Sequence, residues 1–374
     1  MIRSHKVRLN PTPEQEVNFR KSVGTARFVY NWGLNRWKEA KAQGLTEYGV
    51  MALKKEFNGL KEEQFPWVYE VTKSVCESAF TNLGKALKNY FDSKKGARKG
   101  AKVGFPSFKK KHKAKQTFGL ANDRFKVDGH RIKIEKLGVV NMAEPLRFQG
   151  KIMGATVSCV AGKWYISIQV EIAQPEPLRL ERKSTGVDLG VKTLATLSAP
   201  GGHPTEFENQ KLLRRQLNQL KKLNRSQARR QLQSNRWYKA KDKLARFHEC
   251  IKNQRSDAIH KMTTGIARTY SIVGVEDLHI KGMVKNRKLA LSIADAGMGE
   301  VLRQLTYKAE TFGSRIVKVG RFYASSKTCN DCGHINKELT LSDRTWTCQG
   351  CGTIQHRDWN AAKNIEQEAL RLIA

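Results

Sequence analysis

The chain has 374 residues, which exceeds one ordinary domain and predicts two or three. Its hydrophobic content of 39% is low but adequate for folded cores, which excludes an intrinsically disordered protein. Lys and Arg number 69 against 34 Asp and Glu, which gives a net charge of +35. Because such an excess repels itself in a compact chain, it predicts a polyanionic partner, and nucleic acid is the natural one.

No apolar run approaches the roughly 20 residues of a membrane-spanning helix, so no membrane partner is expected. The N-terminus also lacks the apolar core of a signal peptide. Four of the seven cysteines lie in two close pairs, and the odd remainder of Cys76, Cys159 and Cys250 predicts a reducing cytoplasm. We expect these three cysteines to be small core residues.

The N-terminal part is predicted to be mainly helical. Residues 2–9 alternate weakly, as in one short strand, and Thr12-Pro13-Glu14-Gln15 is typical of a helix start with a capping box. Apolar residues at three-four spacing continue this helix to Tyr30, and further helices are expected over Met51–Phe57 and Val71–Tyr90. Four aromatic residues of this part either pack in its core, which we favour, or stack on bases: Trp32, Trp37, Trp67 and Tyr69.

A basic run follows these helices. Residues 92–115 contain ten Lys or Arg and one acid, interleaved with Phe105 and Phe108. Such a run is either a solvated linker or a loop that grips phosphates, and the aromatic residues favour the second. Phosphate contacts would give affinity without sequence choice. The candidate nucleic-acid contacts are the lysines of its second half: Lys109, Lys110, Lys111, Lys113 and Lys115.

Between residues 116 and 174 the hydrophobic period changes to two. Residues 164–171 alternate as a half-buried strand, and a turn at 160–163 joins it to a strand before it. Shorter strands are expected over Arg131–Ile134 and Val139–Met142. The pattern predicts a small antiparallel barrel, which residues 2–9 complete.

After Pro175 the pattern predicts a second unit with buried strands. Residues 185–198 are typical of two strands joined by a tight turn, with Asp188 on the first, and a buried strand at 271–276 ends in Glu276. A carboxylate among buried apolar residues is costly unless it is paired or binds a metal. Between these strands, residues 211–256 hold fifteen Lys or Arg and two acids, which we expect on a hairpin of two basic helices.

The last hundred or so residues are predicted to begin with a flexible loop from Lys281 to Gly299. A helix over 302–312 and a strand over 316–319 follow, and a helix over 360–373 ends the chain.

Two cysteine pairs lie within this last region. Cys329 and Cys332 form one CxxC pair, Cys348 and Cys351 form the other, and fifteen residues separate the pairs. This spacing matches a four-thiolate zinc ribbon. Four sulfurs close the shell of the metal, so we expect the Zn²⁺ to be structural.

Asp358 comes seven positions after the last cysteine and opens the final helix. Taken alone, it is most simply a helix N-cap. Together with Asp188 and Glu276, on two strands and a helix, it completes the acidic set of an RNase H-like nuclease. Such a set holds two Mg²⁺ or Mn²⁺ ions about 3.5–4 Å apart, which activate water and stabilise the leaving oxygen in phosphodiester hydrolysis.

The order Asp188, Glu276, zinc ribbon, Asp358 resembles TnpB, together with Ser325–Cys329 and Asp358–Ala362 around the ribbon and Leu9–Gln15 near the N-terminus. TnpB proteins are transposon-encoded, RNA-guided DNA endonucleases with a RuvC-type active site, related to type V CRISPR effectors. The resemblance implies a multidomain α/β and β-barrel fold. It comprises a first wedge strand over 1–10, a helical recognition domain over 11–95, a wedge barrel over 96–179 and an RNase H-like (RuvC) nuclease domain over 180–374, with the zinc ribbon inserted at 322–356.

The resemblance also implies an enzyme that cuts DNA complementary to a bound guide RNA, next to a short flanking motif. Its partners would be guide RNA from the transposon end and double-stranded target DNA, in a monomeric ribonucleoprotein of the prokaryotic cytoplasm that associates with the nucleoid. Two alternatives remain open. An RNA-guided repressor that does not cut is disfavoured by the presence of all three acids, and a strand-transfer transposase is disfavoured by the wedge and recognition regions.

Overall fold

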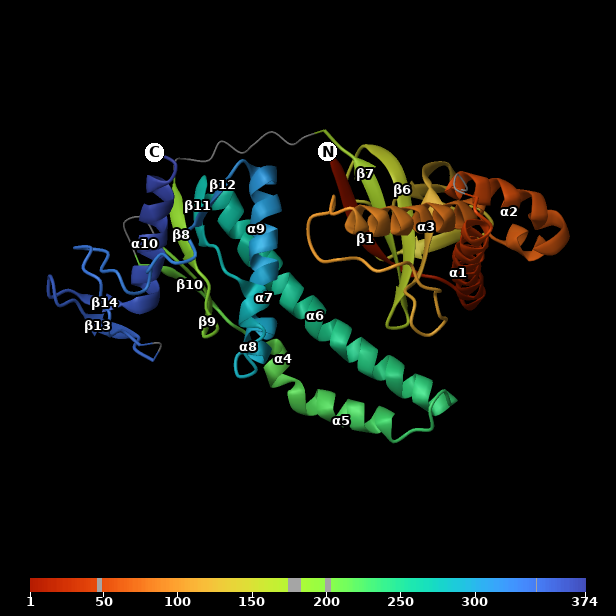
Figure 1. Ribbon diagram of the computed structural model, residues 1–374. Coiled ribbons are helices and arrows are strands. Elements are labelled where there is room, and N and C mark those ends of the chain that lie inside the picture. Colours follow the sequence, from red (N-terminus) through yellow and green to blue (C-terminus); the bar gives the residue numbers. More distant parts are fainter. Residues whose placement is uncertain (46–48, 174–182, 199–202, 341) are drawn as a thin grey trace. The chain divides into compact units, whose positions relative to one another are not determined.

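The computed structural model describes residues 1–45, 49–173, 183–198, 203–340 and 342–374. It divides into two compact units, Met1–Gln174 (unit 1) and Pro175–Ala374 (unit 2), which are drawn in Figure 1. Across the described ranges, no helix has both the length and the apolar character needed to span a membrane.

Unit 1 contains a seven-stranded sheet in the order β2-β6-β7-β1-β5-β4-β3, antiparallel at every pair. Its strands are β1 (Ile2–Asn10), β2 (Gln116–Ala121), β3 (Phe125–Asp128), β4 (Arg131–Ile134), β5 (Gly138–Met142), β6 (Lys151–Val160) and β7 (Lys163–Glu171). Strand β1 pairs with β7 from Ile2↔Glu171 to Leu9↔Trp164, so the predicted place of residues 2–9 in this sheet is confirmed. Among the described residues no pair joins β2 to β3, and closure into a barrel is not confirmed.

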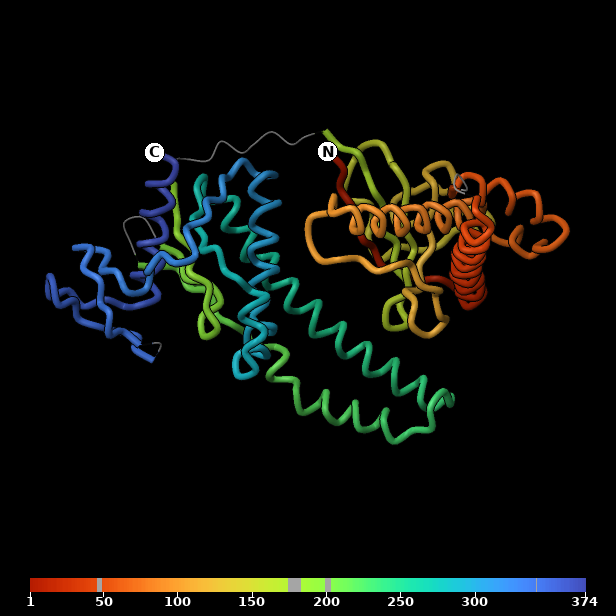
Figure 2. Tube along the Cα trace, in the orientation of Figure 1, coloured from red at the N-terminus to blue at the C-terminus, as the bar shows by residue number. Residues whose placement is uncertain are grey.

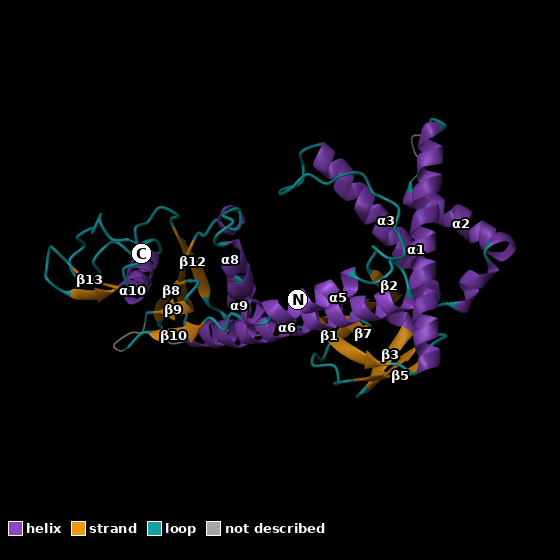
Figure 3. Cartoon of the chain, turned by 90° about the horizontal axis from the view of Figure 1, so that it is seen from below, coloured by secondary structure: helices purple, strands orange, loops and turns teal. Residues whose placement is uncertain are grey.

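The helices of unit 1 are longer than the sequence pattern predicted. They are α1 (Pro13–Ala42), α2 (Val50–Gln64) and α3 (Lys73–Lys94), with a 3₁₀ turn at Pro66–Glu70. The predicted capping box is present, because Thr12 Oγ1 accepts from Gln15 N at 3.3 Å and Gln15 Oε1 accepts from Thr12 N at 3.0 Å. The first half of α1 packs on the sheet and its second half packs with α2 and α3. Figure 3 shows α2 on the far side of α1 from the strands.

The four aromatic residues of this region differ in how far they are buried. Trp32 and Trp37 pack against the helical core, as we favoured. In contrast, Trp67 is 40% exposed and Tyr69 is 51% exposed, so part of each ring remains open to solvent. For Trp67 and Tyr69, stacking on a base therefore stays a prediction.

Unit 2 is built on a five-stranded mixed sheet in the order β10-β9-β8-β11-β12. The strands are β8 (Ser184–Asp188), β9 (Thr193–Leu197), β10 (Thr205–Glu208), β11 (Ile272–Glu276) and β12 (Arg315–Val319). Strands β8, β11 and β12 are parallel neighbours, β9 pairs antiparallel with β8, and β10 pairs antiparallel with β9. The predicted hairpin at 185–198 and the predicted strand ending at Glu276 are therefore confirmed.

Seven helices and a two-stranded sheet of unit 2 lie in its described part. The helices are α4 (Leu212–Arg215), α5 (Leu217–Ala228), α6 (Asn235–Thr269), α7 (Ile280–Met283), α8 (Ala290–Ala296), α9 (Met298–Phe312) and α10 (Arg357–Arg371). The small sheet pairs β13 (Thr345–Thr347) with β14 (Ile354–His356). The basic helical hairpin is confirmed.

Two sequence predictions in unit 2 are wrong. The loop expected over 281–299 contains most of α7 and all of α8, because Ile293 and Ala296 give this stretch an apolar face that is buried in the core. Cys250 is exposed on α6, whereas Cys76 is buried and Cys159 is partly buried. The apolar face of α6 at this point is provided by its neighbour Ile251, so Cys250 turns to solvent.

Helix α10 lies directly on the strands of unit 2 at two glycines. Gly186 of β8 and Gly274 of β11 are register partners, so their bare Cα atoms sit side by side. A Cβ atom at Gly186 would lie 2.0 Å from the carbonyl oxygen of Ala362, and one at Gly274 would lie 2.8 Å from the Cβ atom of Ala369. The two glycines therefore set how closely α10 approaches the sheet, which Figure 1 shows beside β8.

We predict that Gly186→Ala lowers the free energy of unfolding of unit 2 by about 1–3 kcal/mol, because the new methyl group must displace the backbone of α10. Urea unfolding of both proteins measures this difference. The control is Gly265→Ala in α6, where a Cβ atom meets nothing within 4 Å. There the change should stabilise the helix by roughly 0.5–1 kcal/mol. Equal stabilities for wild type and Gly186→Ala would contradict the described contact.

Candidate active site and zinc centre

Asp188 and Glu276 end two neighbouring parallel strands. Because Val187 is the register partner of Val275, the two carboxylates follow at the same edge of the sheet. Both side chains are half-buried. Burial raises the pKa of Asp188 to about 7, and the negative charges of Glu276 and Asp358 add to this rise. The three predicted acids are thus electrostatic neighbours.

Asp358 lies in the first turn of α10, which begins at Arg357 after the N-cap residue His356. The interpretation of Asp358 as the N-cap is therefore wrong, because the N-cap lies two residues earlier in the chain. Its side chain is 13% exposed, and Arg344 Nη1 donates to both carboxylate oxygens at 3.2 Å. The guanidinium of Arg357 lies 3.8 Å from Oδ1. A carboxylate at this place is also favoured by the positive end of the helix dipole.

Glu276 is held by a serine that precedes the zinc ribbon. The buried hydroxyl of Ser325 donates to Glu276 Oε1 at 2.6 Å. The backbone around Ser325 is held in turn by two buried amides of α10. Asn364 Nδ2 donates to the carbonyl oxygens of Ser325 at 2.7 Å and Thr328 at 2.6 Å, and Asn360 Nδ2 donates to the latter at 2.7 Å.

This asparagine clamp, Asn360 and Asn364, also reaches the first cysteine pair. Asn330 donates from its backbone N–H to Asn360 Oδ1 at 2.8 Å and from its side chain to Asn364 Oδ1 at 3.2 Å. Asn330 lies between Cys329 and Cys332. One helix therefore carries Asp358 and fixes both the support of Glu276 and the first zinc knuckle.

The three acids are less closely gathered than the four cysteines. Across the described residues, the group of three or more potential ligands whose donor atoms all lie within 4.8 Å of one another is Cys329, Cys332, Cys348 and Cys351. Three carboxylates repel one another, and here Ser325 donates to Glu276 while Arg344 donates to Asp358. Their hard oxygen atoms nevertheless fit Mg²⁺ or Mn²⁺ in chemistry, since each comes from a different element at one sheet edge.

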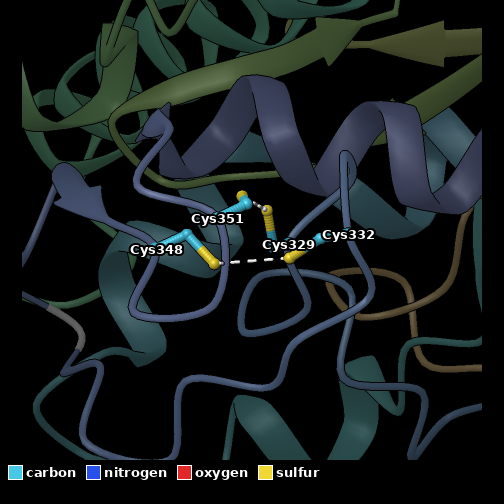
Figure 4. A group of neighbouring side chains, drawn as sticks. All are labelled: Cys329, Cys332, Cys348 and Cys351. Carbon is cyan, nitrogen blue, oxygen red and sulfur yellow. Dashed lines mark hydrogen bonds between the residues drawn. The ribbon is translucent and has the colours of Figure 1, made fainter.

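The four cysteines fit one zinc ion. Figure 4 shows their sulfurs pointing toward one another, with Cys329 Sγ and Cys351 Sγ 3.7 Å apart and Cys332 Sγ and Cys348 Sγ 3.5 Å apart. Tetrahedral Zn–S bonds of about 2.3 Å place sulfurs about 3.8 Å apart, close to these separations. Two N–H groups support the sulfurs, since Gln355 Nε2 donates to Cys329 Sγ and Gly350 N donates to Cys348 Sγ, each at 3.4 Å.

The candidate lysines of the basic run have two different environments. Lys109 is half-buried, with its Nζ atom 3.7 Å above the ring of Tyr30, and burial lowers its pKa. Asn31 Nδ2 donates to the carbonyl oxygen of Lys109 at 3.0 Å, and Asn31 Oδ1 accepts from the backbone N–H of Lys109 at 2.7 Å. Lys109 thus anchors the run to α1. The other four candidates are exposed: Lys110, Lys111, Lys113 and Lys115.

Sequence reasoning missed Arg344 and both residues of the asparagine clamp. Arg344 gave no signal, because its contact with Asp358 spans fourteen positions and depends on the fold of the ribbon. The clamp could have been found, since Asn360 and Asn364 are four positions apart and lie on the apolar face of an amphipathic helix. Polar groups on such a face need partners.

Three protein-family profiles match parts of the chain. One described as "Probable transposase" covers residues 167–287, a "Cas12f1-like, TNB domain" covers 299–365, and a "Helix-turn-helix domain" covers 1–45. The second includes all four cysteines and Asp358. Over residues 1–45 the structure has strand β1 and the single continuous helix α1, so the name of the third profile does not describe this segment.

The chain is 33% identical to "Putative RNA-guided DNA endonuclease InsQ" of Escherichia coli (strain K12), over 97% of this chain and 91% of that protein. "TnpB-like protein L79" of Acanthamoeba polyphaga mimivirus is 24% identical, over 55% of this chain and 41% of that protein. The chain belongs to the TnpB family. The predicted family membership is thus confirmed over nearly the whole length.

The fold of this TnpB-family protein is like that of Cas12f. The solved structure of a Cas12f1-sgRNA-target DNA complex matches it with a TM-score of 0.56 and 15% identity, over 98% of each chain. At this identity the likeness shows the fold alone. It agrees with a chain that combines a helical and sheet-containing unit, a mixed-sheet unit and a cysteine-bearing segment of the TNB type.

We predict that Asp188→Asn stabilises the protein at pH 8 when no divalent ion is added. The folded pKa of about 7 lies above the ordinary value of 3.8, so the folded chain holds this proton better than the unfolded chain. Stability therefore falls as the pH rises from about 4 to about 7, and the penalty remains in full above pH 7. The amide removes this penalty, which is on the order of 2–4 kcal/mol.

Urea unfolding of both proteins between pH 4 and pH 8 tests this expectation, and the difference should vanish at the acid end. The control is Asp277→Asn, since Asp277 is paired with Arg321 at 2.6 Å and is more exposed. It should not gain stability at pH 8. Parallel pH profiles for wild type and Asp188→Asn would show that the Asp188 carboxyl carries no such penalty.

A second prediction concerns the cysteines. Cys348→Ser should lower the bound zinc to well below one ion per chain, because three sulfurs and a hydroxyl no longer provide four soft anionic ligands. Limited proteolysis should then cut within residues 329–356 before other parts of the chain. Zinc content by atomic absorption provides the measurement. Cys250→Ser, at an exposed cysteine outside the group, should keep its zinc. A fully loaded Cys348→Ser protein would refute the four-thiolate site.

Proposed function

We propose that this protein is an RNA-guided DNA endonuclease of a transposable element. It cuts double-stranded DNA complementary to a bound guide RNA, next to a short flanking motif, and acts as a monomeric ribonucleoprotein in a prokaryotic cell. The observation that carries the proposal is the placement of Asp188, Glu276 and Asp358 at one edge of the unit 2 sheet, in a chain that resembles a putative RNA-guided DNA endonuclease over nearly its whole length.

In this proposal unit 2 is an RNase H-like (RuvC) nuclease domain, and the three acids are its catalytic residues. They would hold two Mg²⁺ or Mn²⁺ ions, which supply a metal-activated water and stabilise the leaving oxygen. The half-buried setting of the acids concentrates negative charge where hard cations bind best. Ser325 fixes Glu276 by a hydrogen bond to one oxygen and leaves the other available.

Arg344 has a second role in the proposed reaction. Its guanidinium neutralises Asp358 in the structure described here, and the same group can donate to a phosphate of the DNA backbone. An exchange of Arg344 from the carboxylate to a phosphate would free the oxygens of Asp358 for metal. The four cysteines and their zinc ion take no direct part in cutting, because a closed shell offers no position to water.

The proposal also includes the domain boundaries that the family resemblance implies. Unit 1 would contain the first wedge strand (1–10), the helical recognition domain (11–95) and the wedge barrel (96–179, which extends past the end of unit 1). The nuclease domain would cover 180–374, with the ribbon inserted at 322–356. The four exposed lysines among Lys109–Lys115 would contact phosphates of the guide or the target.

We predict that Asp188→Ala abolishes guided cutting, with a loss of at least about 10³-fold, because one of the three acids that would hold the metal ions is missing. Binding of guide RNA and of target DNA should stay within about twofold, since a carboxylate adds nothing to phosphate affinity. The measurement is cleavage of a plasmid that carries the guide-complementary sequence, beside filter binding of RNA and DNA. The matched control is Asp277→Ala, which removes a neighbouring acid outside the set and should still cut. Retained cutting by Asp188→Ala would remove this residue from the active site.

A further inference from the structure

The hairpin of unit 2 contains a segment that adds almost nothing to the core. We call residues 217–250, which comprise α5 and the first half of α6, the basic arm. Its buried residues are Leu220 and Leu223 of α5, which face α6. In α6, burial begins only at Ile251 and continues through its second half, which packs against α9. Figures 1 and 2 show the two helices of the arm side by side, extending away from the sheet of unit 2.

The basic arm carries ten Lys or Arg and two acids. Eight of these cations are exposed and have no acidic partner within the described residues: Lys221, Lys222, Arg225, Arg229, Arg230, Arg236, Lys239 and Lys243. Some exposed cations elsewhere in unit 2 do have an acidic partner, such as Arg303 with Glu300 at 2.6 Å. The arm is therefore a surface whose charge the rest of the described chain leaves uncompensated.

The cations of the arm form rows along each helix. Lys221 and Arg225 of α5 and its C-cap residue Arg229 are four positions apart, so they follow one another about 6 Å apart on one face. Like charges at this spacing destabilise a helix by roughly 0.2–0.5 kcal/mol per pair. With so few buried residues to offset this repulsion, the arm is a weak structure unless a partner supplies negative charge along its length.

We propose that the basic arm binds the phosphate backbone of double-stranded segments in the guide RNA. A regular row of long cationic side chains fits a polyanion with repeated charges, and such contacts read no sequence. We favour RNA over DNA as the partner of the arm. The repulsion among the cations of the arm is always present, so the partner that offsets it should also stay bound. The guide stays bound through the working cycle of the proposed function, on which this inference rests, whereas a target duplex is bound only in passing.

The experiment compares two triple variants of the full chain that lose the same charge. The arm variant is Lys221→Gln, Arg225→Gln, Arg229→Gln. The control variant is Lys261→Gln, Arg303→Gln, Arg371→Gln, which removes three cations that are each paired with an acid, at 2.8, 2.6 and 2.7 Å. Binding of an RNA stem-loop and of a DNA duplex with the same base sequence is measured over a series of salt concentrations.

For the arm variant, the slope of log affinity against log salt for the RNA stem-loop should fall by about 2–3, since roughly 0.9 is lost per phosphate contact. The control variant should keep the slope of wild type. The thermal midpoint of the arm variant should be no lower than that of wild type, because like-charge repulsion has been removed.

Two results would overturn the inference. An unchanged RNA slope would show that the arm does not bind RNA, and a fall for the DNA duplex alone would assign it to the target. Failure of the proposed function gives a different result, because the binding measurement needs no cutting. A wild-type protein that binds the stem-loop through its arm but cuts no guided target would disprove the nuclease and leave the arm in place.

Discussion

The close approach of α10 to the sheet of unit 2 is the constraint on which the candidate active site depends. Asp188 and Glu276 come two residues after the glycines that this helix touches, and Asp358 lies in its first turn. A side chain at either glycine would separate the helix from the strands and the third acid from the other two. The two glycines therefore allow the close approach that brings the third acid to the other two.

The same helix joins the four-cysteine segment to the candidate active site. The asparagine clamp ties the backbone before Cys329 to α10, and Ser325, within that backbone, holds Glu276. Arg344, within the ribbon, holds Asp358. Two of the three acids thus depend on contacts from the ribbon region, so the fold of the four-cysteine segment also influences where these two carboxylates lie.

Much of this arrangement could be predicted from the sequence, because its signals are local. The cysteine spacing, the acids at the ends of β-branched runs and the capping box at Thr12 each depend on a few neighbouring residues. The contacts of Arg344, Ser325 and the clamp join segments that meet only in the folded unit. The helices at 280–296 were missed because their apolar faces are too short to give a detectable pattern. The exposure of Cys250 was missed because a shift of one position decides which side of a helix is buried.

The order of the acids along the chain has a consequence for synthesis. Asp188 precedes Asp358 by 170 positions (358 − 188), and a ribosome that adds about 5–20 residues per second needs roughly 10–30 s to cover that distance. During this time the strand with Gly186 lacks its covering helix α10. A nascent chain therefore presents the lysines of the basic run well before the three acids of the candidate active site can come together.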